Sequence, residues 1–453
     1  MSTLTKEICR KYIEEVLFEP NDKSLTASAV GKVGVELEIF SFIVNSKNSQ
    51  EKIPVPITGN GVTLEKLLLD LAKKERAKIK IWNADSSFPK YCSQLEEIEF
   101  PDGDRLTFEP GGQVEISTSP CNDLMALQSH LCSKQNLLDE LTESNGVRFF
   151  TCGTHPWFDV KEIKNQLIKP RYQALEKYFD SIGPYGKQMM LQTGSMHINL
   201  DLGFDRSTII RRIVASNLLV PFTTAMFANS PMIQGEITGK AAYRSFLWQH
   251  LDGLRSGMLK IEGLPQLPDI EKLISSYLEF ALKAPIIYIP ELGSQVMPLH
   301  FTFEYWLKHA IEGIRPNEKH LKNHLTLLFP EVRLKGYLEL RSVDAPPKEW
   351  QMLPVLFYSG LLYNDVTLNK TLDLLLPLSH RIHEFRKSAV DGFDSNELYS
   401  ICLKLMHLAM EGFSELPLSF KGDNFDSQFS SFFELFTHKR KSFSEDTLVE
   451  FMA

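Results

Sequence analysis

Carboxylates recur at alternating positions in short segments with β-strand character. Glu36 and Glu38 lie in GVELEIF, Glu115 lies in QVEIS just after the turn Glu109-Pro-Gly-Gly, and Glu339 lies in YLELR. Because successive side chains of a strand point to opposite faces, the acids of each segment share one face and the aliphatic residues share the other. Like charges that face each other across a sheet repel, so their convergence requires a cation. Mg²⁺ prefers oxygen ligands, and these carboxylates therefore indicate a divalent metal site.

Two strand-like segments place other polar groups on one face. His197, Asn199 and Asp201 align in MHINLD, and Arg341 joins Glu339 in YLELR. For any one strand, the alternative is a half-buried antiparallel strand whose polar face meets water. Solvent-facing strands usually carry Thr, Lys, Ser and mixed charges, whereas these carry carboxylates with one histidine and one arginine. From the residues alone, a metal site and a solvated sheet face both stay open.

Three cations accompany the last carboxylate segment, in FPEVRLKGYLELRSVDAPP. Arg333, Lys335 and Arg341 alternate with it, and Gly336 lets the backbone approach closely where the strand begins. Arginine forks match carboxylate and phosphate oxygens, and lysine supplies a mobile point charge. These residues indicate a site for anionic substrates. The alternative is ordinary surface salt bridging with neighbouring glutamates.

The segment YRSFLWQHLDGLRSGM places further charged residues near helical spacing. Arg244, Trp248, Asp252 and Arg255 would share one face of a helix, which predicts either a binding face or an exposed stripe of ion pairs. The sequence holds no GxxxxGK[ST] loop, no GxGxxG after a strand, no HExxH and no GxSxG. A bound nucleotide would therefore be held by metal and cations rather than by a phosphate loop.

Hydrophobic periodicity predicts the elements that must position these residues. Strands are expected at 32–44, 95–100, 105–110, 113–118, 196–201 and 336–344, and helices at 5–18, 63–77, 123–146, 207–227 and 269–283. After Pro346 and Pro347 the pattern is almost only helical. We therefore expect an α+β fold with a catalytic domain at 1–345 and a helical carboxy-terminal lobe at 346–453 packed on the same domain.

Composition excludes several classes of protein. The chain has 453 residues, 43% of them hydrophobic, and its 49 basic and 57 acidic side chains give a net charge of −8, which is unfavourable for a nucleic-acid partner. Its six cysteines form no CxxC pair, so reduced cytoplasmic thiols are expected. The amino terminus lacks the apolar core of an export signal. Polar residues interrupt the apolar stretch at 213–232, which predicts a buried helix and no membrane partner.

Together these motifs resemble the glutamate-cysteine ligases of the plant and proteobacterial type, within the glutamine synthetase-like superfamily of carboxylate-amine ligases. The resemblance runs through GVELEIF, FEPGGQVEIS, MMLQTGSMHINLD, PFTTAMFANSP, RSFLWQHLDGLRSGML and HLTLLFPEVRLKGYLELRSVDAPP, in the expected order over most of residues 30–350. It implies a curved, mostly antiparallel sheet that forms the active-site face and is flanked by helices. It also implies a cytoplasmic ligase of glutathione biosynthesis that joins glutamate to cysteine through γ-glutamyl phosphate, with ATP as co-substrate.

The resemblance also implies roles for individual residues, with two or three Mg²⁺ ions in the site. One ion would be held by Glu38, Glu109 and Glu115, and another, near the transferred phosphoryl group, by Glu36, His197 and Glu339. Glu339 and Arg341 would be catalytic, and Arg333 and Lys335 would bind the triphosphate. Glutamate would be recognised by Asn199, Arg244, Arg255 and Arg341.

The chain departs from plant members of the family at several positions. Plant members commonly carry Gln in place of His197 and Arg in place of Gly336, and their regulatory cysteines have no convincing counterparts among the six here. Two other functions stay open: ligation of glutamate to a different amine, and a nucleotide-binding homologue without turnover. The expected oligomeric state is a monomer or a homodimer.

Overall fold

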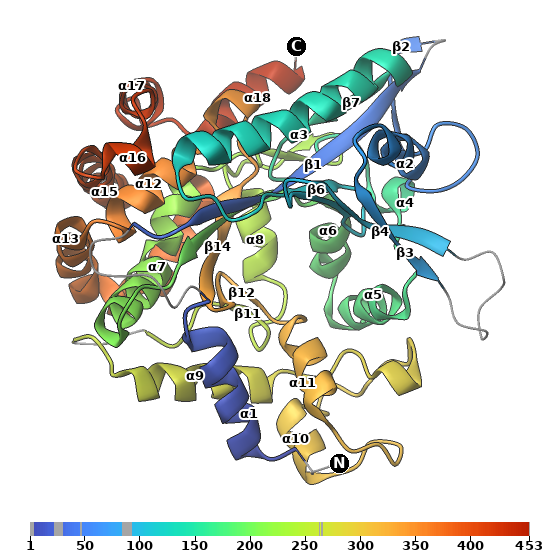
Figure 1. Ribbon diagram of the computed structural model, residues 1–453, viewed down its shortest axis with the longest axis horizontal. Coiled ribbons are helices and arrows are strands. Elements are labelled where there is room, and N and C mark those ends of the chain that lie inside the picture. The colour runs from blue at the N-terminus through green and yellow to red at the C-terminus, as the bar shows by residue number, and fades with distance from the viewer. Residues whose placement is uncertain are drawn as a thin grey trace.

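The computed structural model describes residues 4–21, 30–45, 48–83, 93–261, 263 and 266–452. A large antiparallel sheet runs through its centre, with helices around it (Figure 1). This arrangement confirms the α+β class with a mostly antiparallel sheet. The strands of the sheet are β1 (Val33–Asn45), β2 (Asn48–Pro54), β3 (Lys78–Asn83), β4 (Ser93–Glu99), β5 (Arg105–Phe108), β6 (Val114–Ser117), β7 (Val147–Phe150), β8 (Ser195–Asp201), β13 (Val332–Leu334) and β14 (Tyr337–Asp344).

The strands follow the order β13-β14-β8-β1-β6-β5-β4-β3. The first half of β1 pairs with β8 and β6, and its second half pairs with β2 and β7. The segment with the clearest alternating pattern in the sequence thus forms the centre of the sheet. Two short pairs lie apart from it, β9 (Met232–Ile233) with β10 (Glu236–Ile237) and β11 (Ser256–Gly257) with β12 (Phe329–Pro330).

The alternation in β1 separates an apolar face of the sheet from a polar one. Val35 and Leu37 are fully buried and Ile39 is 3% exposed, as predicted. Burying each such aliphatic side chain stabilises the fold by about 1.5 to 3 kcal/mol. A slip of one residue would exchange them for Glu36 and Glu38 in the core, so the register of β1 is strongly fixed.

Helices cover both faces of the sheet. Residues of α3 (Leu124–Asn145), α7 (Arg206–Met226) and α12 (Met352–Leu362) pack with the apolar face in the main core. A second cluster of buried side chains is centred on α5 (Pro170–Ile182) and α6 (Tyr185–Gln192). In Figure 1, α12 and the neighbouring carboxy-terminal helices gather at the left and α5 and α6 at the right. The polar face therefore lies between the strands and α5, α6 and α8 (Tyr243–Gln249), whose residues line a cavity there.

The remaining helices complete this frame. The amino-terminal α1 (Lys6–Ile13), followed by a π-helical turn at Glu14–Phe18, packs on α9 (Ile270–Lys283). The other helices are α2 (Leu64–Lys74), α4 (Val160–Ile163), α10 (Phe303–Lys308), α11 (Glu318–Leu325), α13 (Asp365–Leu375), α14 (Ile382–Ser388), α15 (Asn396–Ser414), α16 (Leu418–Lys421), α17 (Phe425–Phe432) and α18 (Phe443–Met452).

The predicted buried helix at the apolar stretch is α7. Its side chains from Arg212 to Met226 are all buried, against both the sheet and the carboxy-terminal helices. Within the described part of the chain, no helix is both long and apolar enough to cross a membrane. Residues from both sides of position 345 enter one continuous core, and the expected boundary between 1–345 and 346–453 stays a prediction.

One predicted helix differs from the structure. α8 ends at Gln249, and Asp252 then forms a turn in which its carbonyl accepts hydrogen bonds from the backbone N–H groups of Arg255 and Ser256 (3.0 and 2.9 Å). The prediction that Arg244, Trp248, Asp252 and Arg255 share one face of a helix is therefore wrong. The turn rotates the later residues away from the helical spacing.

Candidate active site

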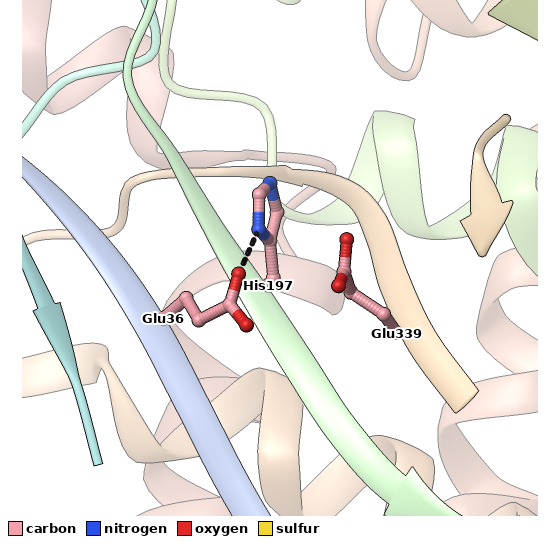
Figure 2. A group of neighbouring side chains, drawn as sticks. All are labelled: Glu36, His197 and Glu339. Carbon is pink, nitrogen blue, oxygen red and sulfur yellow. Dashed lines mark hydrogen bonds and ion pairs between the residues drawn. The ribbon is translucent and has the colours of Figure 1, made fainter. Parts of the chain in front are cut away.

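Cross-strand pairing brings the first acidic group together. Glu36 lies opposite His197, and Glu339 lies opposite Asn199, on three adjacent strands. Nδ1 of His197 is 2.9 Å from Oε2 of Glu36, and Figure 2 shows the two side chains directed at each other with Glu339 beside them. Glu36, His197 and Glu339 each offer one ligand atom within 4.8 Å of the others. They form the first acidic group.

Glu339 is fully buried and surrounded by cations. Nη1 of Arg333 lies 3.1 Å from its Oε1, and Lys335 and Arg341 make further ion pairs with it. Burial would raise the pKa of Glu339, but the three cations outweigh burial and hold its pKa well below the usual range. Burial and Glu339 likewise act to raise the pKa of Glu36, and the hydrogen bond from His197 helps to lower it overall. Both carboxylates are therefore charged at neutral pH.

Among the described residues, the second acidic group makes no ion pair of the kind that surrounds Glu339, although the charge of Arg341 acts to lower the pKa of Glu109. Glu38 lies opposite Glu115 in the pairing of β1 with β6, and Glu109 approaches them from the turn before β6. Their contacts are with neutral donors: Ser195 N–H to Glu38 (2.8 Å), and the hydroxyls of Thr107 and Ser117 to Glu115 (3.0 and 3.1 Å). These three glutamates form the second acidic group.

The pKa values of Glu109 and Glu115 are raised because these buried carboxylates lie close to other carboxylates. Burial and then the charges of Glu36 and Glu38 raise the pKa of Glu115 to about 8. Burial and then Glu115 and Glu38 raise the pKa of Glu109 well above its usual range. Three carboxylates with ligand oxygens within 4.8 Å of one another are a donor set that fits a hard divalent cation such as Mg²⁺.

A third acidic group has a different character. Asp102, Asp104 and His130 also converge, but Nζ of Lys134 lies 2.6 Å from Asp102 and 2.9 Å from Asp104. His130 and the backbone N–H of Ser119 hydrogen-bond the other oxygen of Asp104 (both 2.8 Å). A lysine already supplies the cation here, so this group stabilises the loop at residues 100–104.

A β-bulge directs Arg341 into the site. The register of β14 against β8 shifts between Leu340 and Val343, so Arg341 and Ser342 together lie opposite one residue, His197. The carbonyl of Arg341 accepts a hydrogen bond from Nη2 of Arg244 (2.9 Å), whose Nη1 lies 3.6 Å from the buried Asp344. The bulge and this pair of contacts place two guanidinium groups beside the acidic groups.

Two cavities meet at Glu36. The outer cavity, of about 700 Å³, is lined by Asn21, Lys32, Gly34, Glu36, Arg105, Asn199, Asp201, Lys335 and Tyr337 among others. The inner cavity, of about 200 Å³, is lined by Glu36, the second acidic group, His197, Arg171, Tyr172, Met189, Met190, Arg244, Trp248, Phe329, Arg333 and Arg341 among others. Glu36 therefore faces both spaces.

The structure brings most of the predicted site residues together. Both expected ligand groups converge, Arg244 and Arg341 line the inner cavity, and Asn199 lines the outer one. The two cations expected to act together are divided, with Lys335 at the outer cavity and Arg333 at the inner one.

Arg255 has a different environment from the one expected. It is fully buried, and its guanidinium donates to the backbone carbonyls of Leu327 and Pro285 and lies over the ring of Tyr178. Both terminal nitrogens of its guanidinium thus bond to backbone, and its Nε lies 3.4 Å from Oδ2 of Asp252. Arg255 therefore supports the wall that carries Leu327, and its expected role in recognising glutamate stays a prediction.

Sequence reasoning missed several residues of the two cavities. Arg171 lies on α5 and donates to the hydroxyl of Thr326 (2.8 Å), and Asn21 reaches the outer cavity from the amino terminus. Neither belongs to a motif with a periodic or charged pattern, so the sequence carried no signal for them. Met189 and Met190 also line the inner cavity. They begin the motif MMLQTGSMHINLD, and the pair of adjacent methionines was the one signal that could have indicated a site there.

The antiparallel sheet, its flanking helices and its polar face of carboxylates and cations define an α+β protein with an acidic site on one face of the sheet. A solved structure of glutamate-cysteine ligase from Francisella tularensis in complex with AMP has this fold, with a TM-score of 0.51 and 11% identity over 91% of this chain and 82% of that chain. The sequence pattern of glutamate-cysteine ligase family 2 matches residues 32–400. The chain belongs to that family.

The chain is also similar to plant proteins that are named glutamate-cysteine ligases. The chloroplastic glutamate-cysteine ligase of Medicago truncatula is 34% identical over 318 residues, and that of Nicotiana tabacum is 32% identical over 318 residues. The matches cover 68% of this chain in both cases, and 61% and 59% of the relatives. The chain thus matches about three fifths of the length of these relatives.

Proposed function

We propose that this chain catalyses the ATP-dependent joining of L-glutamate to L-cysteine through γ-glutamyl phosphate. The observation that carries the proposal is the meeting of two cavities at Glu36, between two acidic groups and a cluster of buried cations. Membership of glutamate-cysteine ligase family 2 supports it. Phosphoryl transfer needs reactants to be positioned and oxygens to be neutralised more than it needs a protein nucleophile.

In this proposal the nucleotide occupies the outer cavity. Its volume of about 700 Å³ lies in the usual range for a bound cofactor, and Lys335 offers a cation on its wall. The AMP complex of the Francisella tularensis ligase is consistent with a nucleotide site in this fold. The triphosphate would point toward Glu36, where Lys335 lies 3.8 Å from the carboxylate.

The amino acids occupy the inner cavity. Arg244 and Arg341 offer guanidinium forks to carboxylate oxygens, and both lie on the wall of this cavity. Met189, Met190 and Trp248 supply polarisable apolar surface that suits a thiol. This combination of cations and soft apolar groups favours cysteine over a more polar amine as the acceptor.

Mg²⁺ would be held by Glu38, Glu109 and Glu115, with a further ion at Glu36, His197 and Glu339. When bound, Mg²⁺ would neutralise phosphate and carboxylate oxygens in the site. The second acidic group fits the ion best, because burial and the charges of neighbouring carboxylates raise the pKa values of Glu109 and Glu115. At the first group, triphosphate would compete with Glu339 for the cations that now neutralise that carboxylate.

The proposed reaction has two steps, phosphorylation of glutamate and attack by the amine of cysteine. An oxygen of the glutamate γ-carboxylate attacks the γ-phosphorus of ATP, and ADP leaves. The amine of cysteine then attacks the acyl carbon, gives up a proton, and phosphate leaves with the carboxylate oxygen. Arg341 would hold the γ-carboxylate oxygens during the first step, and the buried inner cavity would keep water from the acyl phosphate.

The proposal is tested by incubating the protein with ATP, Mg²⁺, glutamate and a panel of amines, with phosphate release and product mass measured. Cysteine should give the highest kcat/KM. A different best amine would identify a related ligase. Absence of turnover with every amine, despite nucleotide binding, would identify a homologue without catalysis.

A cytoplasmic location remains a separate proposal. It rests on the dispersed cysteines, which form no CxxC pair. The relatives from Medicago truncatula and Nicotiana tabacum are named chloroplastic. Fractionation of source cells, followed by detection of the protein, tests the location.

A further inference from the structure

The amino-terminal segment reaches the outer cavity although it lies ahead of the part of the chain matched by the family. That match begins at residue 32, and Asn21 lies on the wall of the cavity beside Lys335 and Tyr337. The segment crosses the sharp turn between β13 and β14. This turn carries Lys335, the cation that faces both Glu36 and Glu339.

Asn21 is bonded to both residues of that turn. Its side-chain Nδ2 donates to the carbonyl of Lys335 (3.1 Å), and its backbone N–H donates to the carbonyl of Gly336 (3.0 Å). The backbone N–H of Gly336 donates in return to the carbonyl of Leu17 (3.2 Å). Three hydrogen bonds therefore tie the amino-terminal segment to the backbone that presents Lys335.

Gly336 is required by this close approach. Its φ of +71° lies in the left-handed region, and a Cβ atom built on it would lie 2.2 Å from Oδ1 of Asn21. A larger residue at position 336 and Asn21 in its present place exclude each other. The glycine at position 336 thus makes room for Asn21.

The segment that carries Asn21 is firmly anchored. Leu17 and Phe18 are 7% and 3% exposed, and the ring of Phe18 packs edge-on against Tyr277 with centroids 6.0 Å apart. Nearer the amino terminus, in α1, Arg10 donates to the hydroxyl of Ser275 (3.1 Å) and forms an ion pair with Glu271. A segment held at these points can transmit a fixed position to the turn.

We propose that Asn21 is a positioning residue for the nucleotide. It fixes the turn at 335–336 so that the ammonium group of Lys335 faces the triphosphate, and it completes the wall of the outer cavity. The inference rests on the proposed function, because it takes the outer cavity as the nucleotide site. It goes beyond that function because it assigns a role in nucleotide binding to a residue that precedes the part of the chain matched by the family.

The test measures the binding of a non-hydrolysable ATP analogue with Mg²⁺ by calorimetry, alongside steady-state kinetics. Asn21→Ala removes one hydrogen bond to the turn, and we expect roughly three- to tenfold weaker analogue binding. The KM for ATP should rise by a similar factor, and the KM for glutamate and the Tm should stay unchanged. Asn424→Ala, at an exposed asparagine at the start of α17, is the matched control and should bind the analogue as the wild type does.

A double-mutant cycle with Gly336→Ala tests the mechanism. The added methyl group should weaken analogue binding strongly when Asn21 is present and less in the Asn21→Ala background, where the clash is removed. Equal effects in both backgrounds would overturn the role of the contact. Unchanged analogue binding by Asn21→Ala, or equal losses for ATP and glutamate with a lower Tm, would overturn the inference while the proposed function stands. Failure of the wild type to bind the analogue would overturn the proposed function itself.

Discussion

Glu38 of β1 lies directly opposite Glu115 of β6, in adjacent strands of the central sheet. Like charges at directly paired positions destabilise a sheet, and here both side chains point into the inner cavity. Glu109 adds a third carboxylate to the same place. Apolar residues at these positions would be more stable than uncompensated carboxylates, and we propose that binding of a divalent cation accounts for the three acids.

Mg²⁺ should therefore stabilise the protein and be required for turnover. An ion that binds only the folded state adds about 2.7 kcal/mol to the free energy of unfolding at a concentration one hundred times Kd. Thermal unfolding with and without Mg²⁺ measures this effect, and excess EDTA should abolish ATP turnover until Mg²⁺ is restored. Full turnover in excess EDTA would contradict the metal site.

Substitution within the second acidic group separates metal binding from general charge effects. Glu115→Gln keeps the shape of the side chain but removes a charge, so the protein without metal should be at least as stable as the wild type. Its shift in Tm on adding Mg²⁺ should be much smaller. Glu236→Gln, at an exposed position on β10, is the control and should keep the full shift. A full shift in Glu115→Gln would exclude Glu115 as a ligand.

Arg341→Lys should reduce kcat by about 10²- to 10³-fold. The bulge directs the guanidinium of Arg341 to the inner cavity, and lysine keeps the charge but loses the planar fork. Stabilisation of developing charge by one such group is typically worth about 3 to 4 kcal/mol in the transition state. Steady-state kinetics and thermal unfolding measure the change, and the KM for ATP and the Tm should be nearly unchanged. A wild-type kcat with a raised KM for ATP would instead place Arg341 in triphosphate binding.

Two buried histidines should make the protein less stable in acid. Burial lowers the pKa of His155 and His324 to about 3, whereas in the unfolded chain both titrate near their usual value. At pH values between about 3 and 6.5, the unfolded state therefore binds more protons than the folded state. The free energy of unfolding should therefore fall as pH decreases from about 6.5 toward 3, by up to about 1.4 kcal/mol per pH unit for each histidine.

Urea unfolding at pH 7.5 and 5.5 measures this dependence. Nε2 of His324 donates to the carbonyl of Ala281 (2.8 Å), and His324→Gln replaces the ring with a group that does not titrate. The variant should lose less stability between the two pH values than the wild type loses. An identical loss would show that His324 does not contribute.

Oxidation should affect activity little. Burial raises the pKa of Cys9 and Cys152 to about 12 and that of Cys121 to about 11, so few reactive thiolates form at neutral pH. Among the five cysteines that the structure describes, all of them free, Cys132 is exposed. Cys92 lies outside the described residues.

Diamide treatment followed by an assay with 2-aminobutyrate, which carries no thiol, tests the oxidation prediction. Activity should be retained in both the wild type and Cys132→Ser. A large loss that dithiothreitol reverses would reveal a disulfide switch.

Local alternation predicted much of the site because each strand fixes which of its residues share a face. The carboxylates of β1 and the polar face of β8 followed from the sequence in this way. The order of the strands did not, because pairing joins residues far apart in the chain, such as Glu36 with His197. The convergence of Glu38 with Glu115 required that same long-range register.

Departures from regular geometry explain the remaining differences. Regular alternation cannot predict the bulge that changes the direction of the Arg341 side chain. Helical spacing fails at Asp252, because a turn replaces the helix there and Arg255 is buried away from Arg244 and Trp248. Asn21 entered the site through backbone contacts with Gly336, which leave no pattern of side-chain types. Residues placed by turns or a bulge were therefore among those that sequence reasoning missed or misplaced.

Transfer of oxygen from glutamate to phosphate tests the central claim most directly. Glutamate labelled with ¹⁸O in the γ-carboxylate is turned over with ATP, Mg²⁺ and cysteine, and the released phosphate is analysed by mass spectrometry. The γ-glutamyl phosphate route predicts one ¹⁸O atom in each phosphate released from fully labelled glutamate, together with γ-glutamylcysteine. Phosphate released without ¹⁸O would contradict phosphorylation of the γ-carboxylate and with it the proposed ligase mechanism.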